Sequence, residues 1–81
     1  MTSAQCRAGR ALLGWSAAEL AERAGVHRNT VVRLEAGGEA GHAALAIRVA
    51  LEAAGVVLLP ENGGGAGVRL AKPGAGDDRS D

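Results

Sequence analysis

Residues 17–36 of this 81-residue chain read AAELAERAGVHRNTVVRLEA, a pattern typical of two short helices joined by a glycine turn. Ser16 and Glu19 predict a capping box, in which the Ser16 hydroxyl accepts from the Glu19 amide and the Glu19 carboxylate accepts from the Ser16 amide. The first helix should therefore span residues 17–24. Gly25 ends it, because glycine adopts the left-handed conformation after a helix with little strain.

The second helix of the pair is expected at about residues 27–36, where Val31 and Leu34 form an inward-facing pair and the glycines that follow stop the helix. His27, at its start, is interpreted as a capping or surface residue. Ala21 should lie where the two helices cross, because a larger side chain there would push them apart.

The core has to be built without phenylalanine or tyrosine, since the chain has neither and contains a single tryptophan. Trp15 and Leu20 have the spacing of a hydrophobic staple across the start of the first helix. We therefore expect Trp15 to be the largest part of a core of Ala, Val, Leu and Ile side chains. The neighbours expected to be buried with it are Leu20, Val31 and Leu34.

Polar side chains of the second helix lie on faces that this packing does not need. Arginine can bind guanine, and asparagine adenine, through paired hydrogen bonds, so Arg28, Asn29 and Arg33 are candidates for reading bases in a DNA groove. Thr30 is a candidate for a phosphate contact, and Val32 for contact with a thymine methyl group. The alternative interpretation is an ordinary solvated helix face.

These features carry a resemblance to a known family. It rests on QCRAGRALLGWS at residues 5–16, on RNTVVRLEAG at residues 28–37, and on the spacing of Ala21, Gly25, Val31 and Leu34. The chain resembles the phage-repressor-like helix-turn-helix proteins of bacteria, the Cro-type or XRE family, over residues 5–38 and more loosely to residue 70. The resemblance implies that the preceding helix packs beneath the pair and that the second helix, about residues 27–36, enters the major groove.

The resemblance also implies roles for single residues. Arg10 and Glu35 match positions that form a structural ion pair, and Ser16 and Ala17 match DNA-binding positions at the start of the motif. Relatives commonly carry glutamine where this chain has Ala17, and that glutamine contacts DNA and braces the recognition helix. Ala17 can do neither, so affinity or specificity should be lower than in those relatives.

The remaining segments give the expected fold class, a mainly α domain of four to five helices with a short C-terminal β-hairpin. Leu45, Val49 and Leu51 or Glu52 flank the apolar stripe of the last helix, with Ile47 nearby. The other expected segments are a first helix at residues 4–13, capped by Thr2 or Ser3, the last helix at 42–54, and strands at 56–59 and 67–70. The chain then divides into a DNA-binding domain at residues 1–55, a hairpin at 56–70 and a disordered tail at 71–81.

The charge is distributed unevenly although the net charge is zero. Residues 1–38 carry five arginines against three glutamates, whereas residues 39–81 carry more acidic than basic side chains. The positive half contains the motif, which supports DNA binding. No apolar run is long enough for a membrane helix, and no signal pattern is seen, so no membrane partner is expected. A single cysteine excludes an intramolecular disulfide and suits the cytoplasm.

An enzyme is not expected. Cys6, His27 and His42 lack metal-ligand spacing, so no metal site is predicted. The glycines of residues 63–67 lack the helix that a dinucleotide site needs, and no nucleophile is accompanied by a base. No catalytic residue and no cofactor are therefore predicted.

The sequence predicts a transcriptional repressor that binds double-stranded DNA. The alternative is an antitoxin-like module that neutralises a partner toxin and autoregulates its operon. We also expect a two-fold homodimer through residues 56–70, because both faces of the apolar strand at 56–59 need cover and its outer edge can pair with a second copy. The competing interpretation is that the hairpin folds back on its own core or binds a different partner.

Overall fold

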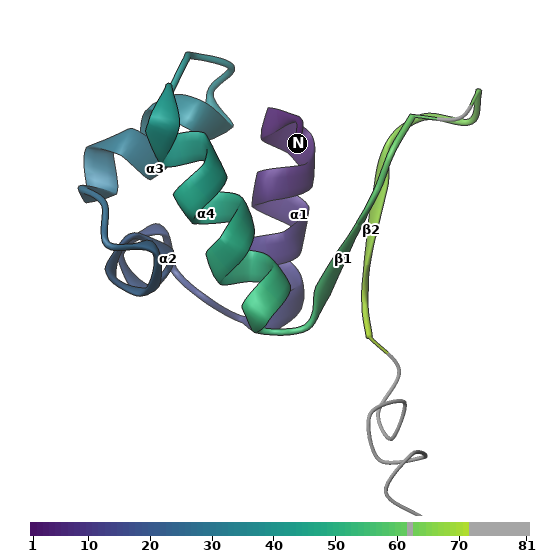
Figure 1. Cartoon of the computed structure of the whole chain (residues 1–81), viewed down its shortest axis with the longest axis horizontal. Coiled ribbons are helices and arrows are strands. Elements are labelled where there is room, and N and C mark those ends of the chain that lie inside the picture. Colours follow the sequence, from purple (N-terminus) through teal and green to yellow (C-terminus); the bar gives the residue numbers. More distant parts are fainter. Residues whose placement is uncertain (62, 72–81) are drawn as a thin grey trace, which may run out of the picture.

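The fold is mainly helical and ends in a two-stranded hairpin, as expected for the class predicted from the sequence. The computed structural model describes residues 1–61 and 63–71; the tail expected to be disordered lies outside the described residues from position 72 on. The elements are α1 (Ser3–Leu13), α2 (Ala17–Ala24), α3 (Arg28–Glu35), α4 (His42–Ala53), β1 (Val56–Leu59) and β2 (Gly67–Leu70). Figure 1 shows the four helices gathered together, with the hairpin beside α1.

Short-range interactions set the helix starts. Thr2 caps α1 with a complete capping box, in which its hydroxyl accepts from the Gln5 amide at 3.0 Å and the Gln5 side chain accepts from the Thr2 amide at 2.8 Å. Ser16 caps α2 by accepting from the Glu19 amide at 3.0 Å. The second half of the expected capping box at Ser16 is replaced, because the Glu19 carboxylate accepts from Arg23 at 2.9 Å, one turn along the same helix.

The turn between α2 and α3 has the predicted glycine geometry. Gly25 has a φ of 73°, in the left-handed region, and the amide of Val26 then donates to the carbonyl of Ala21 at 3.0 Å. Ala21 is buried at the helix crossing. The methyl group at Ala21 lets the two helices of the motif approach closely, and this positions α3.

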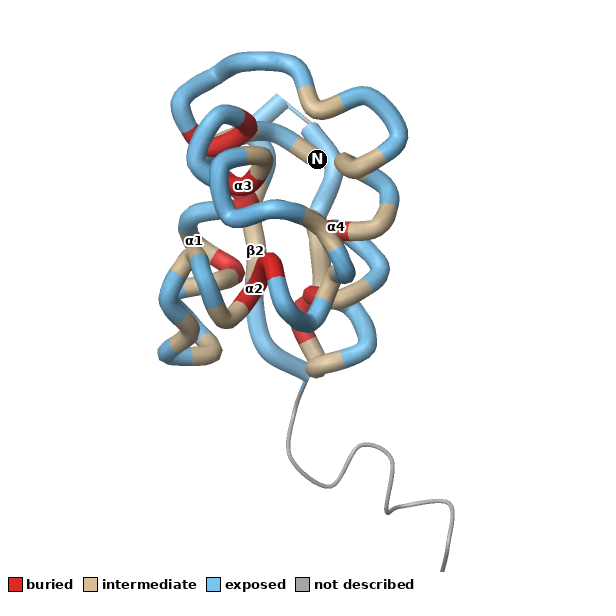
Figure 2. Tube along the Cα trace, turned by 90° about the vertical axis from the view of Figure 1, so that its left-hand side faces the viewer, coloured by how far each residue is buried: buried red, intermediate tan, exposed pale blue. Residues whose placement is uncertain are grey.

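The core consists of aliphatic side chains and the Cys6 thiol. Figure 2 marks the buried positions along the backbone. Its largest fully buried members are Leu20, Ile47, Leu51, Val31 and Cys6. The expectation that Trp15 would be the largest buried piece is wrong, because Trp15 is only half-buried. It packs at the rim of the core, where the Arg23 guanidinium lies 4.8 Å from the centroid of its ring. This position exposes part of the indole.

The last helix also differs from the expectation. Ile47 and Leu51 stand one turn apart on α4, point into the hydrophobic core and are fully buried. Leu45 and Val49, expected beside the apolar stripe, are 66% and 54% exposed. Two residues along a helix correspond to a rotation of roughly 200°, so burial of Ile47 turns its neighbours at these positions outward.

The hairpin packs one face on its own helices. β1 and β2 are antiparallel, with Val56 opposite Leu70 and Leu59 opposite Gly67. Val56 is 2% exposed and belongs to the core. The Gln5 side-chain amide donates to the carbonyls of Leu59 at 2.8 Å and Gly67 at 2.9 Å, which fastens the hairpin to α1. Among the helices, α1 contacts both strands and α4 contacts β1.

Candidate nucleic-acid interface

One side of α3 is packed and the other faces solvent, so the helix can present side chains to a partner. Val31, Leu34 and Glu35 are buried, which fixes the rotation of the helix about its axis. The proposed DNA-binding residues on the opposite side are Arg28, Asn29, Val32 and Arg33, all exposed, together with the half-buried Thr30. At the start of α2, the capping residue Ser16 is exposed and Ala17 is half-buried.

The start of α3 is held by a histidine cap. The Nδ1 atom of His27 accepts a hydrogen bond from the Asn29 amide at 3.0 Å. An imidazole can accept there only while Nδ1 carries no proton. The cap orders the first turn, so Arg28 and Asn29 project from a defined end of the helix. That end also carries the positive pole of the helix dipole, which favours an anion such as phosphate.

Arg33 lies near the other end of α3 and contacts the following loop. Its Nε donates to the carbonyl of Glu39 at 3.3 Å, and the amide of Gly38 donates to the carbonyl of Arg33 at 2.9 Å. A Cβ atom placed on Gly38 would lie 2.7 Å from Cγ of Arg33, so glycine allows the side chain to lie against the loop. A guanidinium has five N–H donors, and the long bond to Glu39 uses one of them.

The C-terminal end of α3 is clamped by an ion pair with α1. The Nε and Nη2 atoms of Arg10 each lie 2.9 Å from an oxygen of Glu35, so the contact is bidentate. The Glu35 side chain is 9% exposed and that of Arg10 is 26% exposed. The hydrogen bond to this carboxylate raises the pKa of Arg10, and Arg10 also donates to the carbonyl of Trp15 at 3.0 Å. The pair ties α1, the link to α2 and the end of α3 together.

Two further residues of α1 converge on Glu35, and sequence reasoning assigned neither to this cluster. The Sγ atom of Cys6 donates to the Glu35 carboxylate at 3.4 Å, and the Arg7 guanidinium donates to the Glu35 main-chain carbonyl. Burial, followed by the bond to Glu35, raises the pKa of the Cys6 thiol to about 12. Cys6, Arg7 and Arg10 lie on one side of α1, and this spacing was the sequence signal that could have predicted that all three contact Glu35.

Other chemistries receive no support from the described residues. In residues 1–61 and 63–71, no three His, Cys, Asp or Glu side chains gather where they could hold a metal ion. Among the helices of the same residues, none is long and apolar enough to cross a bilayer. The candidate residues of α3 instead offer hydrogen-bond donors and acceptors, together with the apolar side chain of Val32.

Comparison with known proteins agrees with this geometry. A family model described as Helix-turn-helix, HTH_3, matches residues 7–53, more than half of the chain. The match runs from α1 to the end of α4 and includes all of α2 and α3. No curated protein was found to match the chain.

Proposed function

Because this chain belongs to the Cro-type, or XRE, helix-turn-helix family of DNA-binding transcriptional regulators, we propose that it is a sequence-specific repressor that inserts α3 into the major groove. The observation that carries the proposal is the two-sided character of α3. Its inner side is held by Val31, Leu34 and the Glu35 clamp, while Arg28 and Asn29 are exposed in its first turn.

Direct base reading is assigned to the exposed polar residues of α3. Arg28 suits the two acceptors of guanine, and Asn29 suits the donor and acceptor of adenine. Arg33, one helical turn further on, is assigned a third base contact, made with the donors that Glu39 leaves available. Val32 is 51% exposed between the two ends of this row, so its methyl groups suit contact with the methyl group of thymine.

Positioning contacts to the DNA backbone are assigned to Thr30 and Ser16. A hydroxyl group can donate to a phosphate oxygen without reading sequence. Ala17 is included at the same edge of the motif, where its methyl group offers no polar contact. A single copy therefore makes one DNA contact fewer than a protein with glutamine at this position. A second copy bound to the same DNA would compensate by doubling the number of DNA contacts.

The proposed protein is therefore a homodimer, with residues 56–70 in the contact. Val56 and Leu58 lie on the face of β1 that packs on the helices, and Leu59, on the other face, is 39% exposed. The outer edge of β1 offers main-chain donors and acceptors to another strand. Two-fold pairing would place two recognition helices about one DNA turn, roughly 34–36 Å, apart on a near-palindromic site.

Selection of bound sequences from random double-stranded DNA, at two salt concentrations, tests the function. Wild-type protein should enrich one motif, and Arg28→Ala or Asn29→Ala should relax preference at particular base pairs, each worth about 1–3 kcal/mol. Thr30→Val should weaken all sequences nearly equally.

Arg69→Ala is the matched control, since it removes one positive charge from an exposed position on β2, away from α3. It should leave the half-site motif unchanged. An unaltered motif with Arg28→Ala would show that Arg28 does not read a base. Absence of any enriched motif with the wild-type protein would refute the proposed function itself.

A further inference from the structure

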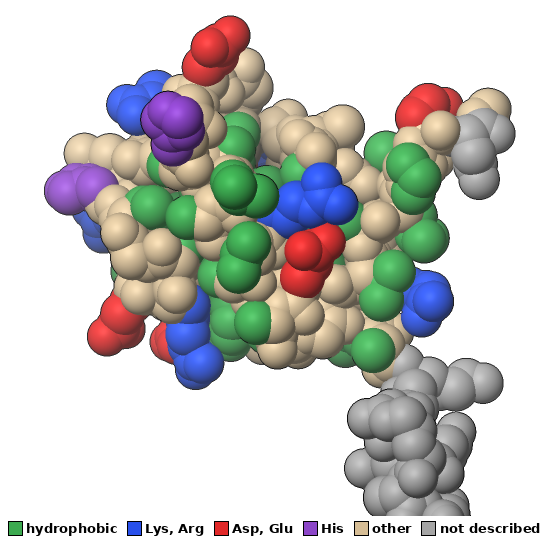
Figure 3. Space-filling view, in the orientation of Figure 1, with side chains coloured by type: hydrophobic (Ala, Val, Ile, Leu, Met, Phe, Trp, Pro, Cys, Tyr) green, Lys and Arg blue, Asp and Glu red, His purple; other side chains and the backbone are tan. Residues whose placement is uncertain are grey.

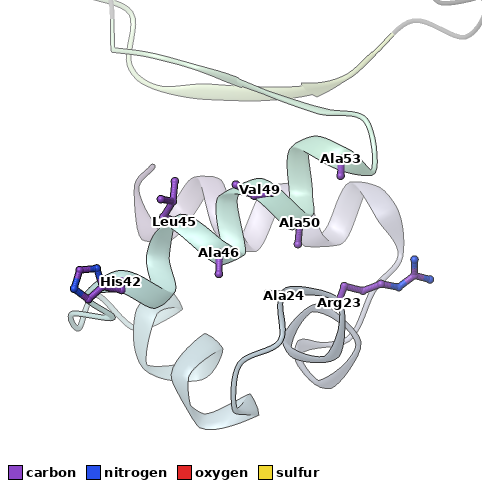
Figure 4. Close-up of a pocket in the computed structure, with 8 residues that line it drawn as sticks. All are labelled: Arg23, Ala24, His42, Leu45, Ala46, Val49, Ala50 and Ala53. Carbon is purple, nitrogen blue, oxygen red and sulfur yellow. The ribbon is translucent and has the colours of Figure 1, made fainter.

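A hollow of about 490 Å³ lies between α4 and the end of α2. Its floor is built from small side chains, and Figure 4 shows Ala46 and Ala50 of α4 directed towards Ala24 of α2. Leu45 and Val49 also line it, and Figure 4 shows them pointing away from α2. The surface thus places two large apolar side chains beside a cavity with an apolar floor.

Within residues 1–61 and 63–71, no segment of the same copy covers Leu45 and Val49. They are 66% and 54% exposed and stand one turn apart on the same face of α4. Single exposed apolar residues are common on protein surfaces, but adjacent ones beside an apolar hollow are typical of an interaction site. We call Leu45, Val49 and the alanine floor the α4 surface.

The α4 surface continues onto the edge of β1. Since α1 contacts both strands and α4 contacts β1, the free edge of β1 lies on the α4 side of the sheet. Arg48 of α4 lines a smaller hollow with Leu58 and Pro60, which joins the two regions. Figure 3 shows apolar side chains over α4 and over the hairpin on one face of the molecule.

Main-chain geometry leaves that edge of β1 open. The Ala71 amide donates to the Gly55 carbonyl at 2.7 Å, so Gly55 and Ala71 form a hydrogen-bonded pair at the base of the hairpin. Hydrogen-bonded and non-bonded pairs alternate along an antiparallel ladder. The main-chain groups of Val56 and Leu58 therefore point outward from β1, towards the side on which α4 lies.

We propose that the α4 surface binds the α4 surface of a second copy, around a two-fold axis that passes beside Val49. Two copies of α4 then cross in antiparallel directions, with Val49 against Val49. Leu45 and Ala53 stand one turn to either side of Val49, so each Leu45 meets Ala53 of the other copy. The large side chain of each copy thereby enters the small-residue hollow of the other, as a self-complementary two-fold contact requires.

Charge also favours a second copy over another occupant. The charges around the α4 surface occur in ion pairs. Arg48 and Glu52 of α4 pair at 3.1 Å, with side chains 48% and 43% exposed, and Arg23, which lines the hollow from α2, pairs with Glu19 at 2.9 Å. The face is therefore neutral and offers no attraction to a polyanion. In the antiparallel arrangement Arg48 of each copy approaches Glu52 of the other, so the pattern of charges is complementary to itself.

This contact rests on the proposed dimeric regulator and gives it a second contact beside the hairpin edge. None of the residues assigned to base reading lines the hollow, so α3 stays accessible in the dimer. The same two-fold axis brings the β1 edges of the two copies to one side of the α4 contact. The α4 surface and the strand edge thus form one continuous interface.

The test exploits the position of Val49 on the axis. Full-length Val49→Glu and Val49→Lys proteins each place like charges opposite one another, which should raise the dissociation constant of the dimer by about 100-fold in sedimentation equilibrium. An equimolar mixture of the two should recover dimers, because Glu then faces Lys, and native mass spectrometry should show mixed pairs. Leu12→Glu on α1, 43% exposed and outside the α4 surface, is the matched control and should dimerise like wild type.

Each outcome decides the proposal. Val49→Glu protein that dimerises like wild type, a mixture that stays monomeric, or wild-type protein that is monomeric at every concentration would overturn it. Loss of dimers with Val57→Glu on β1 but not with Val49→Glu would assign the contact to the hairpin alone. Helical content of each variant, from circular dichroism, should match wild type because residue 49 is exposed. Half-site selection with the Val49→Glu monomer should keep the wild-type base preferences, so failure of the DNA-binding proposal would be seen separately.

Discussion

Replacing Arg10 by methionine should destabilise the fold strongly, because it leaves the buried Glu35 carboxylate without its bidentate partner. The Glu35 side chain is 9% exposed, and after the change its remaining side-chain contact is the 3.4 Å bond from Cys6. Breaking a buried ion pair by removing one partner typically costs about 3–5 kcal/mol, and we expect about 2–4 here because Arg10 is 26% exposed. A chain of 81 residues has a total stability of roughly 4–12 kcal/mol, so the loss is a large fraction.

The assay is urea denaturation followed by circular dichroism, with unfolding free energies extrapolated to water. Glu19→Gln is the matched control, since it breaks the exposed pair with Arg23, whose side chains are 56% and 38% exposed. That change should cost about 0.2–1 kcal/mol. The double variant Arg10→Met with Glu35→Leu should recover much of the loss, because a well-packed apolar pair can replace a buried ion pair. Arg10→Met costing no more than Glu19→Gln would refute the clamp.

Two other predictions concern α1. Gly9→Ala would place a Cβ atom 3.2 Å from Cγ1 of Val56 and 3.6 Å from the Leu51 side chain. Crowding should outweigh the gain of about 1 kcal/mol in helix propensity, for a net loss of about 1 kcal/mol, and Val56→Ala in the same protein should reduce that loss. The Cys6 thiol has a pKa raised by burial from 9.0 to about 12, so its contribution to stability is complete below pH 9 and declines as pH rises towards 12. Urea midpoints across that range should fall less steeply for Cys6→Ser than for wild type, and equal slopes would contradict the assignment.

The element boundaries could be predicted from the sequence alone, because the signals at helix ends act over a few residues. The helices predicted at residues 4–13, 17–24, 27–36 and 42–54 differ from the observed bounds by at most one residue at either end. Thr2 and Ser16 begin α1 and α2 through hydrogen bonds to amides three residues on, and Gly25 ends α2 through its left-handed conformation. The spacing and chemistry of residues 28–33 likewise predict the DNA-binding residues, and their roles remain a proposal.

The face that each element buries is set by packing between elements, and the local sequence pattern does not specify it. The sequence of α4, HAALAIRVALEA, is apolar around most of its circumference, so its periodicity cannot select between Ile47 and Val49 as the inward position. Packing against α1, α2 and β1 makes that choice, and it leaves Leu45 and Val49 outside. The cluster around Glu35 also depends on tertiary packing, because Cys6, Arg7 and Arg10 precede Glu35 by 25 to 29 residues in the sequence. Local signals set where helices begin and end, whereas the face that each helix buries depends on contacts between segments distant in the sequence.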